Sequence, residues 1–150
     1  MHTSEDFLRI AREWIDTPYR NQGRTKKVET DCVGLLIGIG QELGYDTGEE
    51  PKDYGIIPDP RKLLGRIRNF CDFFSFDVND ASPGDILLIT WREQPSGQPH
   101  HTAIRAEWKG RPTIIHAHSI AGKCVEHGLT EDWKKRVRSV WRPKKIEGSD

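Results

Sequence analysis

One apolar segment in the first third of the chain most constrains how it can fold. A helix built from Cys32 to Leu43 would be apolar almost all round, which is typical of a helix enclosed by the core. Thr30 is a good N-cap residue, and Gly44 is a good residue to follow the last helical turn. The sequence therefore predicts a buried helix that runs from about Asp31 to Leu43.

Cys32 would lie in the first turn of this helix. Unpaired backbone N–H groups and the helix dipole favour a thiolate there, and the thiolate is the reactive form of cysteine. Two considerations weigh against a reactive thiol: free cysteine is often a small buried hydrophobe, and the carboxylate of Asp31 would raise the thiol pKa. A nucleophilic Cys32 therefore needs a base from elsewhere in the chain.

Size and composition limit the classes of protein that fit. The chain has 150 residues, of which 35% are hydrophobic and 31% charged, with a formal net charge of zero. No apolar run approaches the roughly 20 residues that cross a bilayer, and the first residues lack the pattern of a signal peptide. We expect one domain over residues 1–150, made in the cytoplasm, without membrane insertion or nucleic-acid binding.

Helical patterns come first in the chain and strand-like segments follow. Amphipathic helices are predicted from Ser4 to Thr17 and from Pro60 to Phe70. The predicted strands cover 73–78, 86–91, 101–108, 113–118, 124–127 and 138–143, with a helical turn at 130–133. This order indicates an α+β domain whose strands form an antiparallel meander.

Four of the six histidines fall in two of these predicted strands. His100 and His101 begin one strand, and His116 and His118 end the next. If His101 and His116 are opposite or diagonal neighbours across the hairpin, they share one face within about 8 Å. Cys32, on a helix packed against that face, would complete a nucleophile, a base and a group that orients the base.

The histidines also fit two other interpretations. They could be polar residues at the rim of the sheet. Alternatively, His116 and His118 could bind a metal together with His101, Cys124 or His127. No spacing matches a known zinc signature, so we expect neither a metal nor another cofactor. The three cysteines are odd in number and widely spaced, which argues against a disulfide framework.

Five short blocks follow one another along the chain. They are Thr17-Pro18-Tyr19, Asp31-Cys32-Val33-Gly34-Leu35, Pro83-Gly84-Asp85-Ile86-Leu87, His101-Thr102-Ala103-Ile104 and Ile115-His116-Ala117. Together they resemble the NlpC/P60 cell-wall peptidases, which are papain-like cysteine peptidases, over about residues 5–143. The resemblance implies N-terminal helices and a central nucleophile helix packed on an antiparallel sheet. The Asp-Cys-Val-Gly form, and the closing Trp followed by basic residues, look more like the phage-tail and gene-transfer-agent branch.

The resemblance also implies a role for each matching residue. Cys32 is similar to the nucleophile, His101 to the general base and His116 to the polar residue that orients the base. Tyr19 resembles a tyrosine on the oxyanion side of the cleft. Asp31 resembles an acidic residue that can hold a free amine of the substrate.

The reaction implied by the resemblance is metal-free amide hydrolysis through a thioester. The implied substrate is a peptidoglycan stem peptide, cut between D-glutamate and a diamino acid. Phage tail proteins are the implied partners, and delivery in a tail tip or release during lysis would bring the protein to the cell wall. The alternatives are an acyltransferase or another amidase on the same fold, a wall-binding module without catalysis, and a metal-binding protein.

Overall fold

The computed structural model describes residues 4–46, 60–90 and 101–144. Its helices are α1 (Ser4–Glu13), α2 (Cys32–Glu42), α3 (Pro60–Phe70) and α4 (Glu131–Lys134), with one 3₁₀ turn, η1 (Val78–Asp80). Its strands are β1 (Arg24–Thr25), β2 (Glu29–Thr30), β3 (Cys71–Ser75), β4 (Ile86–Ile89), β5 (His101–Trp108), β6 (Arg111–His118), β7 (Lys123–Gly128) and β8 (Val137–Pro143). The prediction of an α+β domain with helices first is confirmed.

The main sheet departs from the predicted meander at one place. Six of the described strands form an antiparallel sheet in the order β3-β8-β4-β5-β6-β7. Strands β4 to β7 follow one another as predicted, but β8 inserts between β3 and β4. All four residues of β4 are buried. A strand so fully buried is favoured at the centre of a sheet, where both of its edges find partners.

Asp85 connects the start of β4 to β8. Its buried carboxylate accepts two hydrogen bonds from the guanidinium of Arg142, at 2.8 and 3.0 Å. The same carboxylate accepts the backbone N–H of Ser82 at 2.8 Å. The block that contains Asp85 therefore has a structural explanation in this chain: it holds the last strand in the middle of the sheet.

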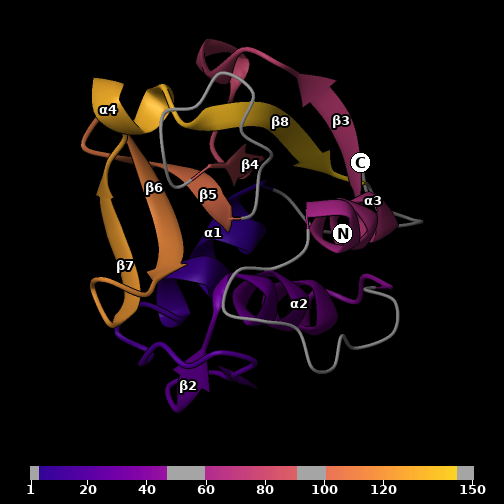
Figure 1. Ribbon diagram of the computed structural model, residues 1–150, viewed down its shortest axis with the longest axis vertical. Coiled ribbons are helices and arrows are strands. Elements are labelled where there is room, and N and C mark those ends of the chain that lie inside the picture. Colours follow the sequence, from indigo (N-terminus) through magenta and orange to yellow (C-terminus); the bar gives the residue numbers. More distant parts are fainter. Residues whose placement is uncertain (1–3, 47–59, 91–100, 145–150) are drawn as a thin grey trace.

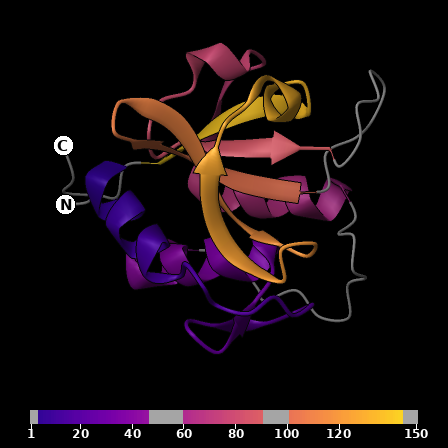
Figure 2. The same ribbon diagram turned by 90° about the vertical axis from the view of Figure 1, so that its left-hand side faces the viewer.

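The two faces of the sheet carry separate apolar clusters. The larger cluster lies between the sheet and α1, α2 and α3. A smaller cluster covers the other face, where Trp133 of α4 and Val78 of η1 pack against it. Figures 1 and 2 show α1 and α2 together on one side of the sheet and α4 on the other. The prediction of a helix packed on an antiparallel sheet is confirmed.

Helix α2 is enclosed as the sequence predicts, and two glycines allow close approach. A Cβ atom at Gly34 would lie 2.0 Å from the carbonyl oxygen of Gly23. A Cβ atom at Gly38 would lie 2.3 Å from the indole ring of Trp14. The backbone at Gly23, just before β1, and the ring of Trp14, just after α1, can therefore pack directly against the backbone of α2.

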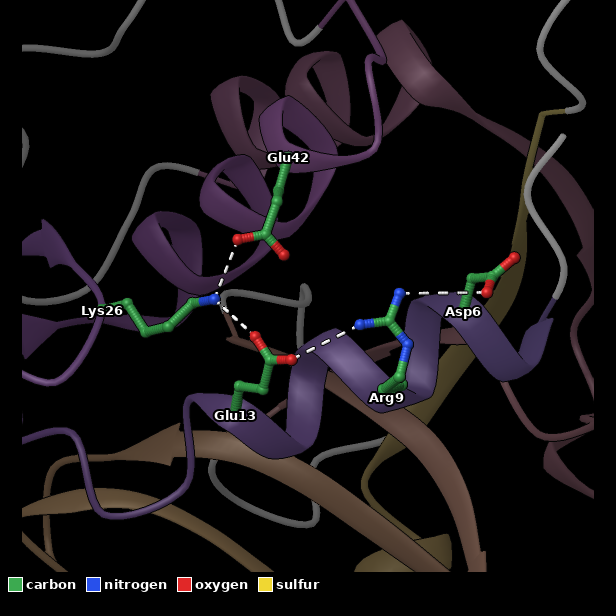
Figure 3. Close-up of polar contacts among 5 residues, drawn as sticks. All are labelled: Asp6, Arg9, Glu13, Lys26 and Glu42. Carbon is green, nitrogen blue, oxygen red and sulfur yellow. Dashed lines mark hydrogen bonds and ion pairs between the residues drawn. The ribbon is translucent and has the colours of Figure 1, made fainter.

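Ion pairs join α1, α2 and the turn between β1 and β2 at the surface (Figure 3). The ammonium of Lys26 lies 2.7 Å from a carboxylate oxygen of Glu13 and 2.8 Å from one of Glu42. Arg9 extends the network along α1 to Glu13 and Asp6, at 3.5 and 3.9 Å. These groups are exposed or partly exposed, so solvent screens the pairs and each contributes little to stability.

The remaining differences from the sequence predictions are local. Helix α1 ends at Glu13 instead of continuing to Thr17, and turns cover the interval. The short pair β1–β2 and the turn η1 are additions that no long apolar pattern signalled. None of the described helices is long and apolar enough to cross a membrane.

Candidate active site

The start of α2 is fixed by a buried carboxylate. Asp31, not Thr30, is the N-cap: its Oδ1 accepts the N–H of Gly34 and its Oδ2 accepts the N–H of Gln22, both at 2.7 Å. Thr30 belongs to β2, and its hydroxyl donates to the carbonyl of Asp31. The predicted cap was wrong by one residue because Thr30 is held in strand pairing and the longer-reaching carboxylate satisfies two donors. Cys32 is therefore the first residue of the helix.

The thiol of Cys32 is held in its protonated form. Burial, followed by the charge of Asp31, raises the pKa of Cys32 to about 12. Hydrogen bonds from Thr102 and from the N–H of Val33 lower this pKa by less. Of the opposing effects considered from the sequence, burial and the charge of Asp31 outweigh the helix start, so Cys32 needs a base in order to react. The proton has to leave when the sulfur reacts.

Thr102 joins this first turn of α2 to β5. Its hydroxyl donates to the carbonyl oxygen of Cys32 at 3.4 Å, and both residues are buried. The preceding residue in β5 is His101, which is also buried. The nucleophile candidate therefore meets the sheet at the residues where β5 begins.

His101 and His116 form a buried hydrogen bond. Nε2 of His101 lies 2.8 Å from Nδ1 of His116, and the two side chains are 2% and 0% exposed. The register of β5 and β6 pairs Ile104 with Ile115, so the two histidines are diagonal neighbours. The prediction that they share one face of the sheet is confirmed.

That face is not the one that packs on α2. Side chains alternate along a strand, so His101 and His116 lie with Ala103 and Ile114, on the side of the smaller cluster. Thr102 points the other way, toward α2. The expectation that α2 packs on the histidine face is therefore corrected. Helix α2 packs on the opposite face, and Cys32 contacts the sheet at Thr102, where β5 begins.

His118 has a different set of contacts. Its Nδ1 accepts the backbone N–H groups of Ile120 and Ala121, at 3.1 and 3.4 Å, in the turn that follows β6. Burial, followed by the charges of His127 and Arg136, lowers the pKa of His118. The structure therefore brings His116 rather than His118 into hydrogen bonding with His101.

His127 extends the buried pair, and the sequence suggested it only as a metal ligand. Its Nε2 lies 2.8 Å from Nε2 of His116, and its Nδ1 lies 3.0 Å from the carbonyl oxygen of Gly128. Trp133 of α4 covers both rings, with centroids 5.1 Å from His116 and 5.2 Å from His127. The signal in the sequence was the alternation of side chains between the two faces of the predicted strand 124–127. It places His127 beside His116 only once the pairing of β6 with β7 is known.

The histidine nitrogens bind each other and do not converge on a common point. Two nitrogens that bind one zinc ion at about 2.0–2.1 Å in tetrahedral geometry lie roughly 3.3 Å apart, further than the 2.8 Å separations found here. In the described parts of the chain, no group of three His, Cys, Asp or Glu residues is placed to hold a metal ion. The geometry thus favours a hydrogen-bonded chain.

Tyr19 lies beside the start of α2. Its backbone N–H donates to the carbonyl of Gly122 at 2.8 Å, and its side chain is half-buried. Burial, followed by electrostatic interactions with the nearby Cys32 and Asp31, raises the pKa of Tyr19 to about 12. The phenol is therefore near the thiol and remains a hydrogen-bond donor at neutral pH.

The other two cysteines are not part of this arrangement. Cys71 and Cys124 are free thiols buried in the core. His100 lies outside the described residues. The sequence blocks thus lead in the structure to Tyr19, Cys32 and the histidine pair.

Comparisons with known proteins support the fold at low sequence identity. No family model and no curated protein sequence matches the chain. Among solved structures, an NlpC/P60 family protein from Bacillus cereus superposes with a TM-score of 0.65 and 19% identity, over 93% of this chain and 39% of that one. This chain therefore spans well under half of that protein.

Two other solved structures are matched along nearly their whole length. The NlpC/p60 domain of the peptidoglycan hydrolase SagA gives a TM-score of 0.59 and 19% identity, with 93% of this chain and 97% of that chain covered. An N-acetylmuramoyl-L-alanine amidase from Bacteroides uniformis gives a TM-score of 0.64 and 15% identity, with coverages of 95% and 99%. The helices and antiparallel sheet described here are therefore the papain-like fold of the NlpC/P60 proteins.

Proposed function

We propose that this protein is a cysteine-dependent peptidoglycan hydrolase that cleaves an amide bond in stem peptides. The observation that carries the proposal is the buried hydrogen bond between His101 and His116 at the strand start that contacts Cys32. A nucleophile, a base and an orienting group on three separate elements form the arrangement that cysteine hydrolases need. The names of the structural neighbours support the class of substrate.

The reaction proceeds in two halves. The sulfur of Cys32 attacks the scissile carbonyl carbon while its proton passes to Nδ1 of His101, since Nε2 is engaged by His116. The developing oxyanion is stabilised by backbone N–H groups at the start of α2, with the hydroxyl of Tyr19 nearby. His101 then protonates the leaving amine as the C–N bond breaks, and a thioester remains on Cys32.

Water completes the cycle. His101 removes a proton from a water molecule, the water oxygen adds to the thioester carbon, and the C–S bond breaks to release the carboxylic acid. The sulfur takes back the proton and returns to the thiol form that burial favours. A thiol that is protonated between turnovers is protected from oxidation, because oxidation acts on the thiolate.

The finer specificity rests on the sequence blocks. They support cleavage between D-glutamate and a diamino acid, and action of the protein in a phage tail with tail proteins as partners. A role for Asp31 in holding the substrate amine is part of this proposal. Both of its carboxylate oxygens already accept backbone N–H groups, so an amine would have to use the remaining lone pairs.

Two other functions share most of these features. An acyltransferase forms the same thioester and differs only in the group that attacks it, and another amidase differs only in the bond that it selects. A wall-binding module without catalysis has no need for the buried histidine pair, so the hydrogen bond between His101 and His116 favours an enzyme.

Digestion of purified muropeptides, with mass identification of the products, tests the proposal. The expected result is hydrolysis within the stem peptide by the wild-type protein and none by Cys32→Ala, with Cys124→Ala as the control for loss of a buried thiol. Cleavage between muramic acid and L-alanine would establish a different amidase. Products that incorporate an added amine would establish transfer. Equal cleavage by Cys32→Ala, or no reaction with any muropeptide, would overturn the proposal.

A further inference from the structure

We infer that His127 is a positioning residue that fixes, through His116, which nitrogen of His101 carries a proton. The inference rests on the proposed function, in which His101 is the base. It concerns a property of the free protein, so it can be tested without any substrate. Its basis is the order of donors and acceptors along the histidine chain, which begins at a backbone carbonyl.

The carbonyl oxygen of Gly128 sets the direction of the hydrogen bonds along His127, His116 and His101. A carbonyl oxygen only accepts hydrogen bonds, so Nδ1 of His127, 3.0 Å away, has to carry a proton. Nε2 of a neutral His127 is then an acceptor. Nε2 of His116, 2.8 Å from it, therefore carries the proton of that hydrogen bond.

The same reasoning continues to the base. With its proton on Nε2, neutral His116 presents Nδ1 as an acceptor, so Nε2 of His101 donates across the 2.8 Å contact. Neutral His101 then has an unprotonated Nδ1. This is the nitrogen that the proposed mechanism requires as the acceptor of the thiol proton.

His116, the middle histidine, is suited to transmit this order of donors and acceptors from His127 to His101. His116 is completely buried, and burial, followed by the charges of His101, His127 and His118, lowers the pKa of His116 well below its usual range. It therefore stays neutral and has one donor and one acceptor. A neutral imidazole can transmit the tautomeric state of one neighbour to the other.

A second proton on His127 would reverse the direction of the two hydrogen bonds that join the three histidines. Both nitrogens of His127 would then donate, so His116 would accept at Nε2 and donate from Nδ1. Nε2 of His101 would become an acceptor, and the proton of neutral His101 would lie on Nδ1. In that state His101 cannot take the proton of Cys32, so protonation at the far end of the chain switches the base off.

A proton on His101 itself has the opposite effect. Protonated His101 donates from Nε2 to His116, which donates to His127, which donates to Gly128, so every hydrogen bond keeps its direction. The chain thus stabilises the imidazolium that forms when Cys32 attacks. Stabilising charge that appears during the reaction contributes to the rate.

Among residues 4–46, 60–90 and 101–144, the other charged or titratable groups beside these rings are on β6, β7 and the segment after α4. His118 lies beside His116 on β6, and the guanidinium of Arg136 stacks on Trp133 at 4.7 Å while pairing with Asp132. Glu126 precedes His127 in β7 and is engaged by Thr113 and Arg12. Within the part of the protein that the structure describes, the three hydrogen-bonded histidines are therefore influenced by one another, by His118 and by Arg136.

Nitrogen-15 NMR of the free protein tests the tautomers directly. The expected result at neutral pH is a proton on Nδ1 of His127 and on Nε2 of both His116 and His101. Finding the proton of His101 on Nδ1 at neutral pH would overturn the inference, whether or not the protein cleaves peptidoglycan.

Matched variants test the effect on turnover. His127→Gln places an amide oxygen near the position of Nε2 and should preserve the tautomer of His101 and most of kcat. His127→Phe keeps an aromatic ring beside Trp133 but removes the acceptor. It should give mixed tautomers at His101 and lower kcat by about tenfold to a hundredfold, with KM little changed.

His118→Phe is the control, because it makes the same change beside the same tryptophan and beside His116 without removing any of the hydrogen bonds that join His101, His116, His127 and Gly128. It should leave the tautomer of His101 unchanged and kcat within about threefold of wild type. If His127→Phe retains the tautomer of His101, or retains kcat while Cys32→Ala is inactive, the inference fails and the proposed function stands. If no variant and no wild-type protein has activity, the proposed function fails and the NMR result alone decides the inference.

Discussion

The hydroxyl of Thr102 lies 3.4 Å from the carbonyl oxygen of Cys32, and this buried contact connects the first turn of α2 to the start of β5. Thr102 is the residue after His101, so the strand that presents the candidate base is joined to the turn that presents the candidate nucleophile. The relative placement of two distant parts of the chain therefore depends on a single threonine side chain and the packing around it.

Replacement of Thr102 by valine tests this connection. Valine has the same shape but no hydroxyl, so the free energy of unfolding should fall by about 1 kcal/mol. The pKa of Cys32 should rise further, because Thr102 is one of the groups that lower it, and kcat should fall by about tenfold through loss of alignment. Urea denaturation and steady-state kinetics measure the two effects. Thr102→Ser keeps the hydroxyl and should restore both, and an unchanged Thr102→Val variant would contradict the role.

His116 and His118 offer a matched comparison, because they lie two residues apart on one strand. His116→Ala removes the hydrogen-bond partner of His101 and should lower kcat by about a hundredfold, while leaving some activity because orientation is only part of the barrier. His118→Ala removes hydrogen bonds to a turn and ring contacts with His116 and Trp133 but leaves the hydrogen bond between His101 and His116, so it should stay within a few-fold of wild type. Kinetics of the two variants side by side decide between them, and a reversed order would show that the triad has been assigned to the wrong histidine.

Two helical glycines should respond to alanine in opposite directions. At Gly34 a new Cβ would lie 2.0 Å from a backbone oxygen, so Gly34→Ala should lower the free energy of unfolding by about 1–3 kcal/mol or more. Gly65 in α3 has open space around the same position, so Gly65→Ala should stabilise the protein by about 0.5–1 kcal/mol through helix propensity. Denaturant unfolding of both variants gives the measurement. A neutral Gly34→Ala would show that the loop around Gly23 is free to move away.

Stability should fall at alkaline pH because of the buried thiols. Burial raises the folded-state pKa of Cys32 and Cys124 to about 12 and also raises that of Cys71, whereas an unfolded thiol ionises near about 8.5. Their contribution is therefore complete below about pH 8.5 and is lost as the pH rises toward 12, by up to roughly 1.4 kcal/mol per pH unit for each thiol.

Urea denaturation between pH 8.5 and 10 checks this dependence, in a range below the ordinary tyrosine pKa of about 10. Cys124→Ala should have lower stability at all pH values but a shallower decline, because one of the three thiols is gone. A decline that is the same in Cys124→Ala as in wild type would show that other groups cause it.

Much of the fold was predictable from local patterns in the sequence. The apolar run from Cys32 indicates a buried helix, because it is longer than the short apolar runs typical of buried strands. The hairpin that joins β5 and β6 and the alternation within each strand were enough to place His101 and His116 on one face, since side chains alternate strictly along a strand. The sequence alone thus predicted the helix, the hairpin and the histidine pair.

Contacts between distant segments could be found only in the tertiary structure. The insertion of β8 beside β4 depends on strand edges that must find partners, and no local pattern records which edges meet. The N-cap moved from Thr30 to Asp31 because Gln22, nine residues away, supplies a second donor for the carboxylate. The contact between Thr102 and Cys32 likewise joins residues 70 positions apart, and no local pattern predicts it.

The protonation state of the site was also beyond the sequence. Local reasoning at Cys32 sets the helix start, which favours a thiolate, against burial and Asp31, which oppose it, but cannot decide which is larger. In the structure burial is the largest effect and the thiol pKa rises to about 12. The place of His127 at the end of the histidine chain likewise depends on the pairing of β6 with β7 and on the carbonyl of Gly128. Residue types and periodicity are local properties of a sequence, whereas desolvation and the direction of a hydrogen bond depend on every group that folding brings around an atom.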